Sequence, residues 1–378
     1  MKICILCFDL SNNSLGRAGL LAMALKANYE IEIIGPSRSG DIWFPMKDIG
    51  IPIHSYPWKR YPFFISTILK MIKDIDADIM IACKLRPTSF GIALIKKWAS
   101  SIPVILDIDD WELGFFYHSG FWGKLGRFFN FSNPNGLLYT WFLERYTSYA
   151  DSIIVSNRFL QNKFSGTLVY HCRDTTILNP EKFDSDSIKK KLGLKGKRLV
   201  MFLGTPRPHK GISESFLAME KINDPDVRLV IIGADSSIQS QIQKMKNNKD
   251  KVIVLPQISF KELPDHLSAA DILVIPQKDT TDTQGQIPAK LFDAMAMAKP
   301  IITTPISDIP EVMGEHGYLI EPGNPEQLAK TIENIFANPE EAKQKGENAR
   351  KRCQELYDLK VMVKELTFQI EKLTFPQS

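Results

Sequence analysis

The sequence lacks the features that assign a chain to the membrane-spanning, secreted or disulfide-rich classes. No uninterrupted apolar run reaches the roughly 18 residues that a membrane-spanning helix needs. The N-terminus carries Lys2 but no apolar stretch ending in small residues, so it does not have the pattern of a signal peptide. The five cysteines are scattered and odd in number, which favours a reducing compartment over a disulfide framework. We therefore expect a cytoplasmic protein, at most peripheral to a membrane.

A strong excess of one charge is also missing. The formal net charge is +4 and the basic residues are spread evenly, which argues against nucleic acid as a partner. The chain has 378 residues, of which 44% are hydrophobic and 24% charged. That composition is typical of a globular protein, and the length is sufficient for two domains.

Short β-branched runs alternate with helical patterns in two series, separated by a polar stretch at 174–191. Continuous apolar runs separated by helices are typical of parallel sheets covered on both faces. The sequence therefore predicts an α/β protein with two doubly wound, Rossmann-like domains. We expect them at 1–175 and 176–355, with a C-terminal helix at 356–378 packing on the first. The predicted strands are 2–8, 29–35, 77–83, 103–108 and 151–156, then 198–204, 227–233, 251–256, 271–276 and 300–304.

Neither domain carries G-x-G-x-x-G in its first strand-to-helix turn, which argues against a nicotinamide or flavin cofactor. The second domain instead has GTPRPHKG (204–211), between a strand and a helix. Arg207, His209 and Lys210 therefore lie near a helix N-terminus, where cations are unfavourable unless they meet an anion. Solvated loop charges are the alternative.

A second cation lies at a helix start in QGQIPAKLFDAMAMAKP (284–300). Pro288 indicates the first helical turn, which places Lys290 at the positive end of the helix dipole. A diphosphate shared by both cationic turns would explain the two placements. Asp293, one turn further on, either pairs with Lys290 or accepts two hydrogen bonds from a vicinal diol such as ribose.

The order of these motifs resembles a known family. A strand running into GTPRPHKG, then IIGADSS, ISFKELPDHLSAADILVIPQ and IPAKLFDAMAMAKPIITT, is similar to the nucleotide-sugar half of glycosyltransferase family 4 and its GT-B relatives. The resemblance is close over 195–345 and looser in the first half, where LDIDDW and LERYTSYADSIIVSN hold familiar positions. It implies a GT-B fold, with two domains facing across a cleft, and a nucleotide sugar, UDP- or GDP-linked, as donor.

The resemblance also implies roles for single residues. Lys210 matches the diphosphate-binding lysine of the family. The family's arginine usually stands at the position of Thr205, so giving its role to Arg207 requires a shifted backbone. Asp293 takes the place of the ribose-binding carboxylate. The residues assigned to the donor are Gly204, Arg207, Lys210, Gln286, Lys290 and Asp293, with Gln257 and Ile258 at the nucleobase.

The Glu-x₇-Glu pattern of the family is incomplete here. The position of its first glutamate, which in relatives approaches the donor sugar, is Gly285. Either Asp282 or Gln286 substitutes for it, or the reaction relies on the substrate's own phosphate. In a retaining front-face transfer, a leaving phosphate oxygen takes the acceptor's proton while cations stabilise its growing charge.

The first domain has an acidic strand end, LDIDDWE, with Asp107, Asp109, Asp110 and Glu112. As a D-x-D pair, Asp107 and Asp109 would bind a divalent ion, as in metal-dependent glycosyltransferases. The resemblance places Asp109 where relatives often have a histidine, close to the acceptor. We favour this metal-independent interpretation, in which Asp109 or Asp110 orients or deprotonates the acceptor hydroxyl. An acidic cap without a role in chemistry is the remaining alternative.

The first loop, NNSLGRAG, is a further candidate. Gly16 lies where the family's first loop approaches the acceptor and the donor phosphate. Arg17 either adds charge there or is solvated at a helix start.

Aromatic residues are dense between Trp111 and Tyr149, with Lys124 and Arg127 among them, and the basic aromatic stretch YPWKRYPFF (56–64) lies upstream. Aromatics interleaved with cations are typical of a bilayer interface or an apolar acceptor site. Packing of this insertion on the sheet would use the same residues. Segment 111–149 is therefore expected either to be buried or to contact the inner face of the membrane peripherally.

Together these patterns predict a retaining hexosyltransferase that needs neither metal nor cofactor and acts on a sugar, glycan or lipid-linked acceptor, in polysaccharide or glycolipid biosynthesis. Two alternatives stay open. NDP-sugar 2-epimerases share the fold and act on the donor without an acceptor. The absent glutamate also permits an inactive partner subunit that binds nucleotide sugars.

Overall fold

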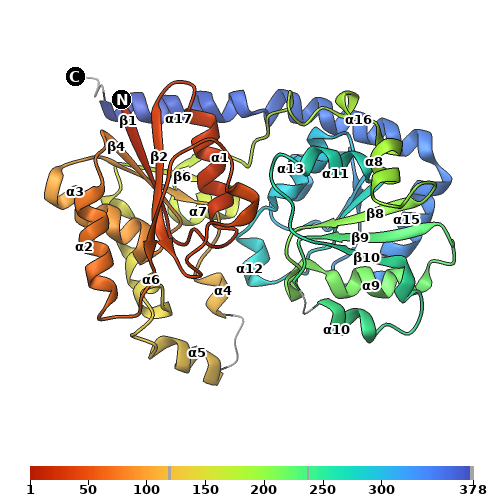
Figure 1. Cartoon of the computed structure of the whole chain (residues 1–378), viewed down its shortest axis with the longest axis horizontal. Helices are drawn as coiled ribbons and strands as arrows, with labels where there is room; N and C mark the ends of the chain where they lie inside the picture. Colours follow the sequence, from red (N-terminus) through yellow and green to blue (C-terminus); the bar gives the residue numbers. More distant parts are fainter. Residues whose placement is uncertain (118–120, 236–237, 375–378) are drawn as a thin grey trace. The chain divides into compact units, whose positions relative to one another are not determined.

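The chain folds into two compact units in a computed structural model, which describes residues 1–117, 121–235 and 238–374 (Figure 1). The first unit comprises Met1–His171, Gln284–Ile287 and the described residues from Lys360 onward; the second comprises Cys172–Thr283 and Pro288–Leu359. The division falls after His171 rather than after residue 175. Segment 284–287, expected in the second domain, is grouped with the first.

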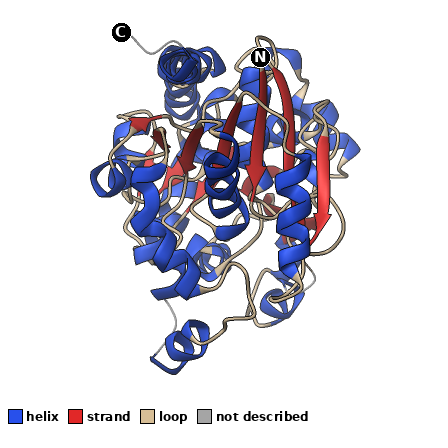
Figure 2. Ribbon diagram, turned by 90° about the vertical axis from the view of Figure 1, so that its left-hand side faces the viewer, coloured by secondary structure: helices blue, strands red, loops and turns tan. Residues whose placement is uncertain are grey.

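The first unit contains a parallel sheet in the order β3-β2-β1-β4-β5-β6-β7. Figure 2 shows helices on both sides of its strands. The strands are β1 (Lys2–Cys7), β2 (Glu30–Ser37), β3 (Ile53–Pro57), β4 (Ile79–Cys83), β5 (Val104–Ile108), β6 (Ser152–Val155) and β7 (Thr167–Leu168). The helices are α1 (Leu15–Leu25), α2 (Phe64–Asp74), α3 (Ile92–Ser100), α4 (Gly114–Tyr117), α5 (Phe121–Phe128), α6 (Leu137–Leu143), α7 (Arg158–Phe164) and α17 (Leu359–Thr374), with short turns η1 (Phe44–Met46), η2 (Pro87–Gly91) and η3 (Glu144–Tyr149).

The second unit contains a parallel sheet in the order β10-β9-β8-β11-β12-β13. The strands are β8 (Arg198–Leu203), β9 (Val227–Ile232), β10 (Val252–Leu255), β11 (Ile272–Ile275), β12 (Ile301–Thr303) and β13 (Tyr318–Leu319). The helices are α8 (Ser185–Lys191), α9 (Ile212–Lys221), α10 (Ile238–Gln243), α11 (Leu263–Ala269), α12 (Thr281–Gln284), α13 (Ala289–Ala296), α14 (Ile309–Met313), α15 (Pro325–Ala337) and α16 (Pro339–Leu356), with η4 (Pro180–Lys182), η5 (Pro208–Lys210) and η6 (Lys249–Lys251).

The apolar runs of the sequence form the central strands of both sheets. Every residue of β4 and β5 is buried, because helices cover both faces and leave no side of the strand for polar residues. The predicted fold class, two parallel-sheet Rossmann-like domains, is therefore confirmed. The structure adds β3, β7 and β13, which are edge strands and are too short or too polar to give an apolar run.

The strand order of each sheet reverses at one point. In the first sheet the reversal lies between β1 and β4, and in the second between β8 and β11. Ligands of open parallel sheets bind beyond the carboxyl ends of strands at such a point. The residues that follow β1, β4 and the adjacent β5 in the first unit, and β8 and β11 in the second, therefore frame the candidate sites.

C-terminal helix α17 packs on the first unit through a buried amide. The side chain of Gln369 accepts from the Ser152 hydroxyl at 2.7 Å and donates to the Thr167 hydroxyl at 3.0 Å. These residues open β6 and β7, so the helix ties down the edge of the sheet.

A buried ion pair closes the carboxyl end of the first sheet. Arg17, on α1, donates to both oxygens of Asp107 at the end of β5, at 2.8–3.2 Å. Its guanidinium also donates to the backbone carbonyls of Val169 and Tyr170. The Arg17 side chain is 1% exposed and that of Asp107 is 0% exposed, so neither charge is solvated by water.

Replacing Arg17 with methionine should destabilise the first unit by about 3–5 kcal/mol, because the Asp107 carboxylate would stay buried without a partner. Urea unfolding followed by a probe in the first unit measures the loss. The control is Arg145→Met, which removes an exposed arginine and should change stability by less than about 0.5 kcal/mol. Equal stability of the two variants would contradict this account.

Candidate functional site

The glycine-flanked loop after β8 is shaped by two left-handed backbone positions. Gly204 has φ +92° and Gly211 has φ +75°. A Cβ at Gly211 would lie 1.7 Å from the carbonyl oxygen of Pro276, so only glycine lets the loop approach the end of β11 this closely. Between the glycines, η5 carries His209 and Lys210, and α9 begins at Ile212.

Lys290 lies in the first turn of α13, at the helix end where its charge is unfavourable. Its ammonium donates to the carbonyl of Leu203 at 3.2 Å and lies 4.3 Å from the centroid of the Phe202 ring. Burial and the nearby charge of Lys210 lower the pKa of Lys290 well below its ordinary value. The structure thus brings the two cationic turns together at the carboxyl end of β8.

The carboxylate of Asp293 has a partner that neither alternative drawn from the sequence included. Its carboxylate forms a buried ion pair with Arg173, which also donates to the carbonyls of Cys172 and Ala289. No ion pair joins Lys290 to Asp293, both of which lie in the described part of the chain. A ribose would therefore share the Asp293 carboxylate with Arg173.

The other residues assigned to the donor occupy the rim of the second sheet. Arg207 is exposed and precedes η5 with an extended backbone. Gln257 is exposed and Ile258 half-buried, on the loop that follows edge strand β10. Asp282 is buried and lies 3.2 Å from the ring of His209, so it is held within the second unit.

In the first unit, the acidic strand end surrounds a lysine that the sequence did not single out. Lys84 follows β4, and its ammonium lies 2.9 Å from Asp109, in contact with Asp110, and 3.4 Å from Glu112. Glu112 is also paired with Arg86. The sequence offered one signal that could have identified Lys84: it is a charged residue directly after a buried strand, at the point where the strand order reverses.

The pKa of Asp109 is raised to about 7. Burial is the largest cause, and the neighbouring carboxylates of Asp110 and Asp107 act in the same direction, against the charges of Lys84 and Arg17. A carboxyl group that changes protonation near neutral pH is suited to handle an acceptor proton.

Segment 284–287 completes this cluster. Gln286 donates to Asp110 at 2.8 Å, and the backbone N–H of Trp111 donates to the carbonyl of Gly285 at 3.1 Å. A Cβ at Gly285 would lie 2.6 Å from the Cβ of Trp111. The position expected to carry a glutamate therefore has no room for a side chain unless the backbone shifts, and the neighbouring Gln286 binds the carboxylate of Asp110.

Comparison with known proteins bears mainly on the second unit. Residues 184–352 match the family model of glycosyl transferases group 1. Curated relatives include spore coat protein SA of Bacillus subtilis, 26% identical over 53% of this chain and 57% of that protein, and an uncharacterized glycosyltransferase of Methanocaldococcus jannaschii, 26% identical over 57% and 58%. The chain thus spans less than three fifths of the length of these relatives.

Solved structures extend the likeness to the whole fold. HepE of Anabaena, in complex with UDP-glucose, superposes with a TM-score of 0.77 over 98% of this chain and 100% of that chain, at 15% identity. At that identity the likeness shows the fold alone, and it agrees with the GT-B class predicted from the sequence.

In the first unit, the position of Arg17 differs from both expectations. Arg17 is neither solvated nor available to a phosphate, because it is buried on Asp107. Gly16 lies within α1, and an added Cβ would meet Trp43 at an ordinary 3.5 Å, so space does not require glycine there. With Asp107 bound to Arg17 and Asp109 to Lys84, the D-x-D pair is already matched by cations, which favours the acceptor interpretation over the metal one.

The aromatic segment 111–149 is partly exposed. Residues 118–120 and the side chains of Tyr117, Phe121, Trp122 and Lys124 lie outside the described part. Phe129 and Phe131 are 58% and 48% exposed, and Phe63, from the upstream stretch, is 72% exposed. Within the described residues, no helix combines the length and apolarity required to cross a membrane.

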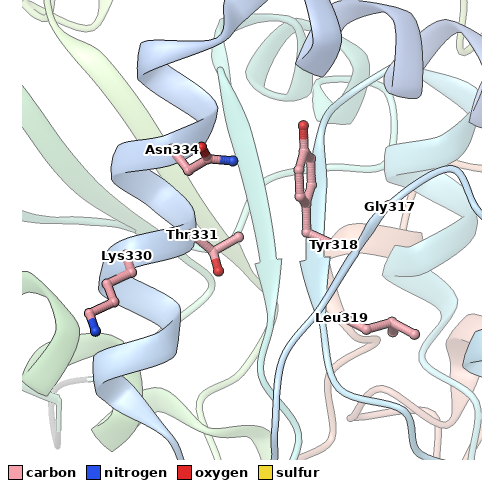
Figure 3. A pocket seen from close by; sticks show the side chains of 6 residues that line it. All are labelled: Gly317, Tyr318, Leu319, Lys330, Thr331 and Asn334. Carbon is pink, nitrogen blue, oxygen red and sulfur yellow. The ribbon is translucent and has the colours of Figure 1, made fainter.

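The second unit also has a pocket of about 410 Å³ between β13 and α15. Tyr318 and Leu319 line it from the strand, and Lys330, Thr331 and Asn334 from the helix (Figure 3). In Figure 3 the Lys330 side chain points away from the strand. None of the residues assigned to the donor lines this pocket.

Replacing Lys290 with methionine should stabilise the ligand-free protein at neutral pH by about 0.5–2 kcal/mol, because a charge held in an unfavourable place is removed. For the same reason the wild type should gain stability as the pH rises from the lowered pKa of Lys290 toward its ordinary 10.5, since the unfolded chain then holds the extra proton. Thermal unfolding across this pH range measures both effects.

The same substitution should abolish the stabilisation that UDP or pyrophosphate gives the wild type. Lys299→Met is the matched control, because burial also lowers the pKa of Lys299, to about 8, while its ammonium binds the carbonyl of Ser268. A Lys290→Met variant that responds to UDP like the wild type would contradict the anion site.

Proposed function

We propose that the protein is a glycosyltransferase of the family 4 type that moves a sugar from a UDP- or GDP-sugar to an acceptor hydroxyl. The observation that carries the proposal is the pair Lys210 and Lys290, held together at the carboxyl end of β8. Two neighbouring cations repel each other, so their placement makes physical sense when a diphosphate lies between them. The complex of HepE, a protein of this fold, with UDP-glucose supports such a ligand.

The proposed reaction proceeds with retention and without a metal ion. The bond from the sugar's anomeric carbon to the diphosphate breaks, and the bond to the acceptor oxygen forms on the same face. The departing phosphate oxygen takes the acceptor's proton, while Lys210 and Lys290 stabilise its charge. This route needs no protein carboxylate at Gly285, where the structure has no room for one.

Donor binding is tested by thermal shift with a panel of UDP- and GDP-sugars. A donor at about 100 times its dissociation constant should add about 2.7 kcal/mol of stability. Lys210→Ala should remove this gain, while the Lys299→Met control should keep it. If no nucleotide sugar stabilises the protein, the proposed function is wrong.

Turnover separates the proposal from its alternatives. Release of the nucleotide diphosphate that is much faster with a sugar, glycan or lipid-linked acceptor than with water alone supports transfer. Release at the same rate with and without an acceptor, or isomerisation of the sugar, would instead indicate an epimerase, and tight binding without turnover would indicate an inactive partner subunit. Activity should be unchanged in excess chelator, and its loss there would contradict the metal-independent site.

A peripheral contact with an anionic membrane surface is part of the proposal. The support is an exposed aromatic patch, which we define as Phe63, Phe128, Phe129 and Phe131 with the exposed cations Lys59, Arg60 and Arg127. Its two segments are joined by a hydrogen bond from the N–H of Tyr61 to the carbonyl of Ser132, at 2.8 Å. Aromatic rings beside cations suit the boundary of a bilayer with anionic lipids, where lipid-linked acceptors lie.

The wild type should float with liposomes that contain anionic lipid, and less so at high salt. Phe63→Ser and Phe129→Ser should each weaken the partition by about 10- to 100-fold, since each removes the burial of a phenyl ring, worth about 1.5–3 kcal/mol. The control is Trp98→Ser, which removes an equally exposed ring, 60% accessible, on α3. A wild type that does not float would end the membrane proposal.

A further inference from the structure

Lys84 is held in an unusual backbone conformation at the reversal point of the first sheet. Its φ is +69°, in the left-handed region that is unfavourable for a residue other than glycine. Hydrogen bonds to the N–H and to the carbonyl of Lys84 fix this conformation. The Lys84 N–H donates to the carbonyl of Asp107 at 2.8 Å, and the Ser89 hydroxyl donates to the carbonyl of Lys84 at 2.8 Å. The side chain, 7% exposed, is thereby directed into the acidic cluster.

The oxygens of this cluster are divided among fixed partners. Oδ2 of Asp110 meets Lys84 and its Oδ1 accepts from Gln286. One oxygen of Glu112 faces Lys84 and the other pairs with Arg86. Oδ1 of Asp109 faces Lys84, whereas no protein group among the described residues donates a hydrogen bond to its Oδ2. Asp109 is therefore the member of the cluster with an oxygen left for a ligand.

We propose that Lys84 is a positioning residue of the acceptor site, which gathers Asp109, Asp110 and Glu112 so that Asp109 alone presents a carboxylate oxygen to the acceptor hydroxyl. This inference rests on the proposed function and assigns separate roles to the two aspartates. Asp109 touches the acceptor hydroxyl and orients it. Asp110, held by Gln286, supports Lys84 from the other side.

The charge of Lys84 also sets the pH at which Asp109 is ionised. The groups that face Asp109 are Lys84 after β4, Arg17 on α1, and the carboxylates of Asp107 and Asp110. Lys84 and Arg17 lower the pKa of Asp109, whereas burial and the two carboxylates raise it. Removing the charge of Lys84 leaves burial and the carboxylates of Asp110 and Asp107 opposed only by Arg17. The pKa of Asp109 should therefore rise above its value of about 7.

The test compares Lys84→Met with the wild type on UDP-glucose and GDP-mannose, using the full chain. Water replaces the unidentified acceptor, and nucleotide diphosphate release is followed as a function of pH. The variant should keep the donor-induced thermal shift, lose about 10- to 100-fold in kcat, and shift the acidic limb of the pH profile upward by at least about one unit. Lys84→Arg, which keeps the charge, should restore the limb. Lys97→Met, which removes a lysine paired with Asp151 on the same unit, should leave the profile unchanged.

The outcomes are distinguishable. If the wild type neither binds nor turns over these donors or any other nucleotide sugar of the thermal-shift panel, the proposed function fails and this inference falls with it. If the wild type turns over and Lys84→Met keeps the wild-type pH profile, Lys84 has no positioning role.

A second pair of variants tests the inference should Lys84→Met not fold. Asp109→Asn should lose at least about 100-fold in kcat, and Asp110→Asn about tenfold. The reverse order of losses would overturn the assignment of the acceptor contact to Asp109.

Discussion

The structure depends on how charge is accommodated at the carboxyl ends of buried parallel strands. Such strands bring the charged residues that follow them into a confined space with little water, where an unmatched charge is costly. The first unit meets this constraint internally, through Arg17 with Asp107 and Lys84 with the acidic cluster. In the second unit Lys290 has only a carbonyl and an aromatic face among the described residues. The charges at the first sheet edge are thus matched by the protein itself, and for the second edge we propose that a bound anion matches Lys290.

Much of the framework follows from local pattern. Ten apolar runs became ten strands, because a strand buried on both faces has to be apolar along its length. The helix start at Pro288 and the place of Lys290 in its first turn were equally visible, since proline and dipole effects act over a few residues. Strands β3, β7 and β13 were not visible, because β7 and β13 have two residues each and β3 is partly polar, whereas edge strand β10 was visible through its apolar run.

The partners of charged residues could not be read from the sequence. Arg17 and Asp107 are 90 residues apart, and Arg173 and Asp293 are separated by 120. Nothing in either neighbourhood signals the other, since these pairs arise from strand order. For the same reason Lys84 passed unnoticed beside the conspicuous LDIDDWE, although Lys84 is the residue that organises that motif.

The contact between Gly285 and Trp111 couples two positions that are far apart in the sequence. The atom that excludes a side chain at position 285 is the Cβ of residue 111, which every amino acid except glycine possesses. Trimming the indole therefore makes no space at position 285. A side chain there would need a glycine at 111 or a displaced backbone, so the two positions are epistatic: no single substitution can place a carboxylate at 285 without moving the segment.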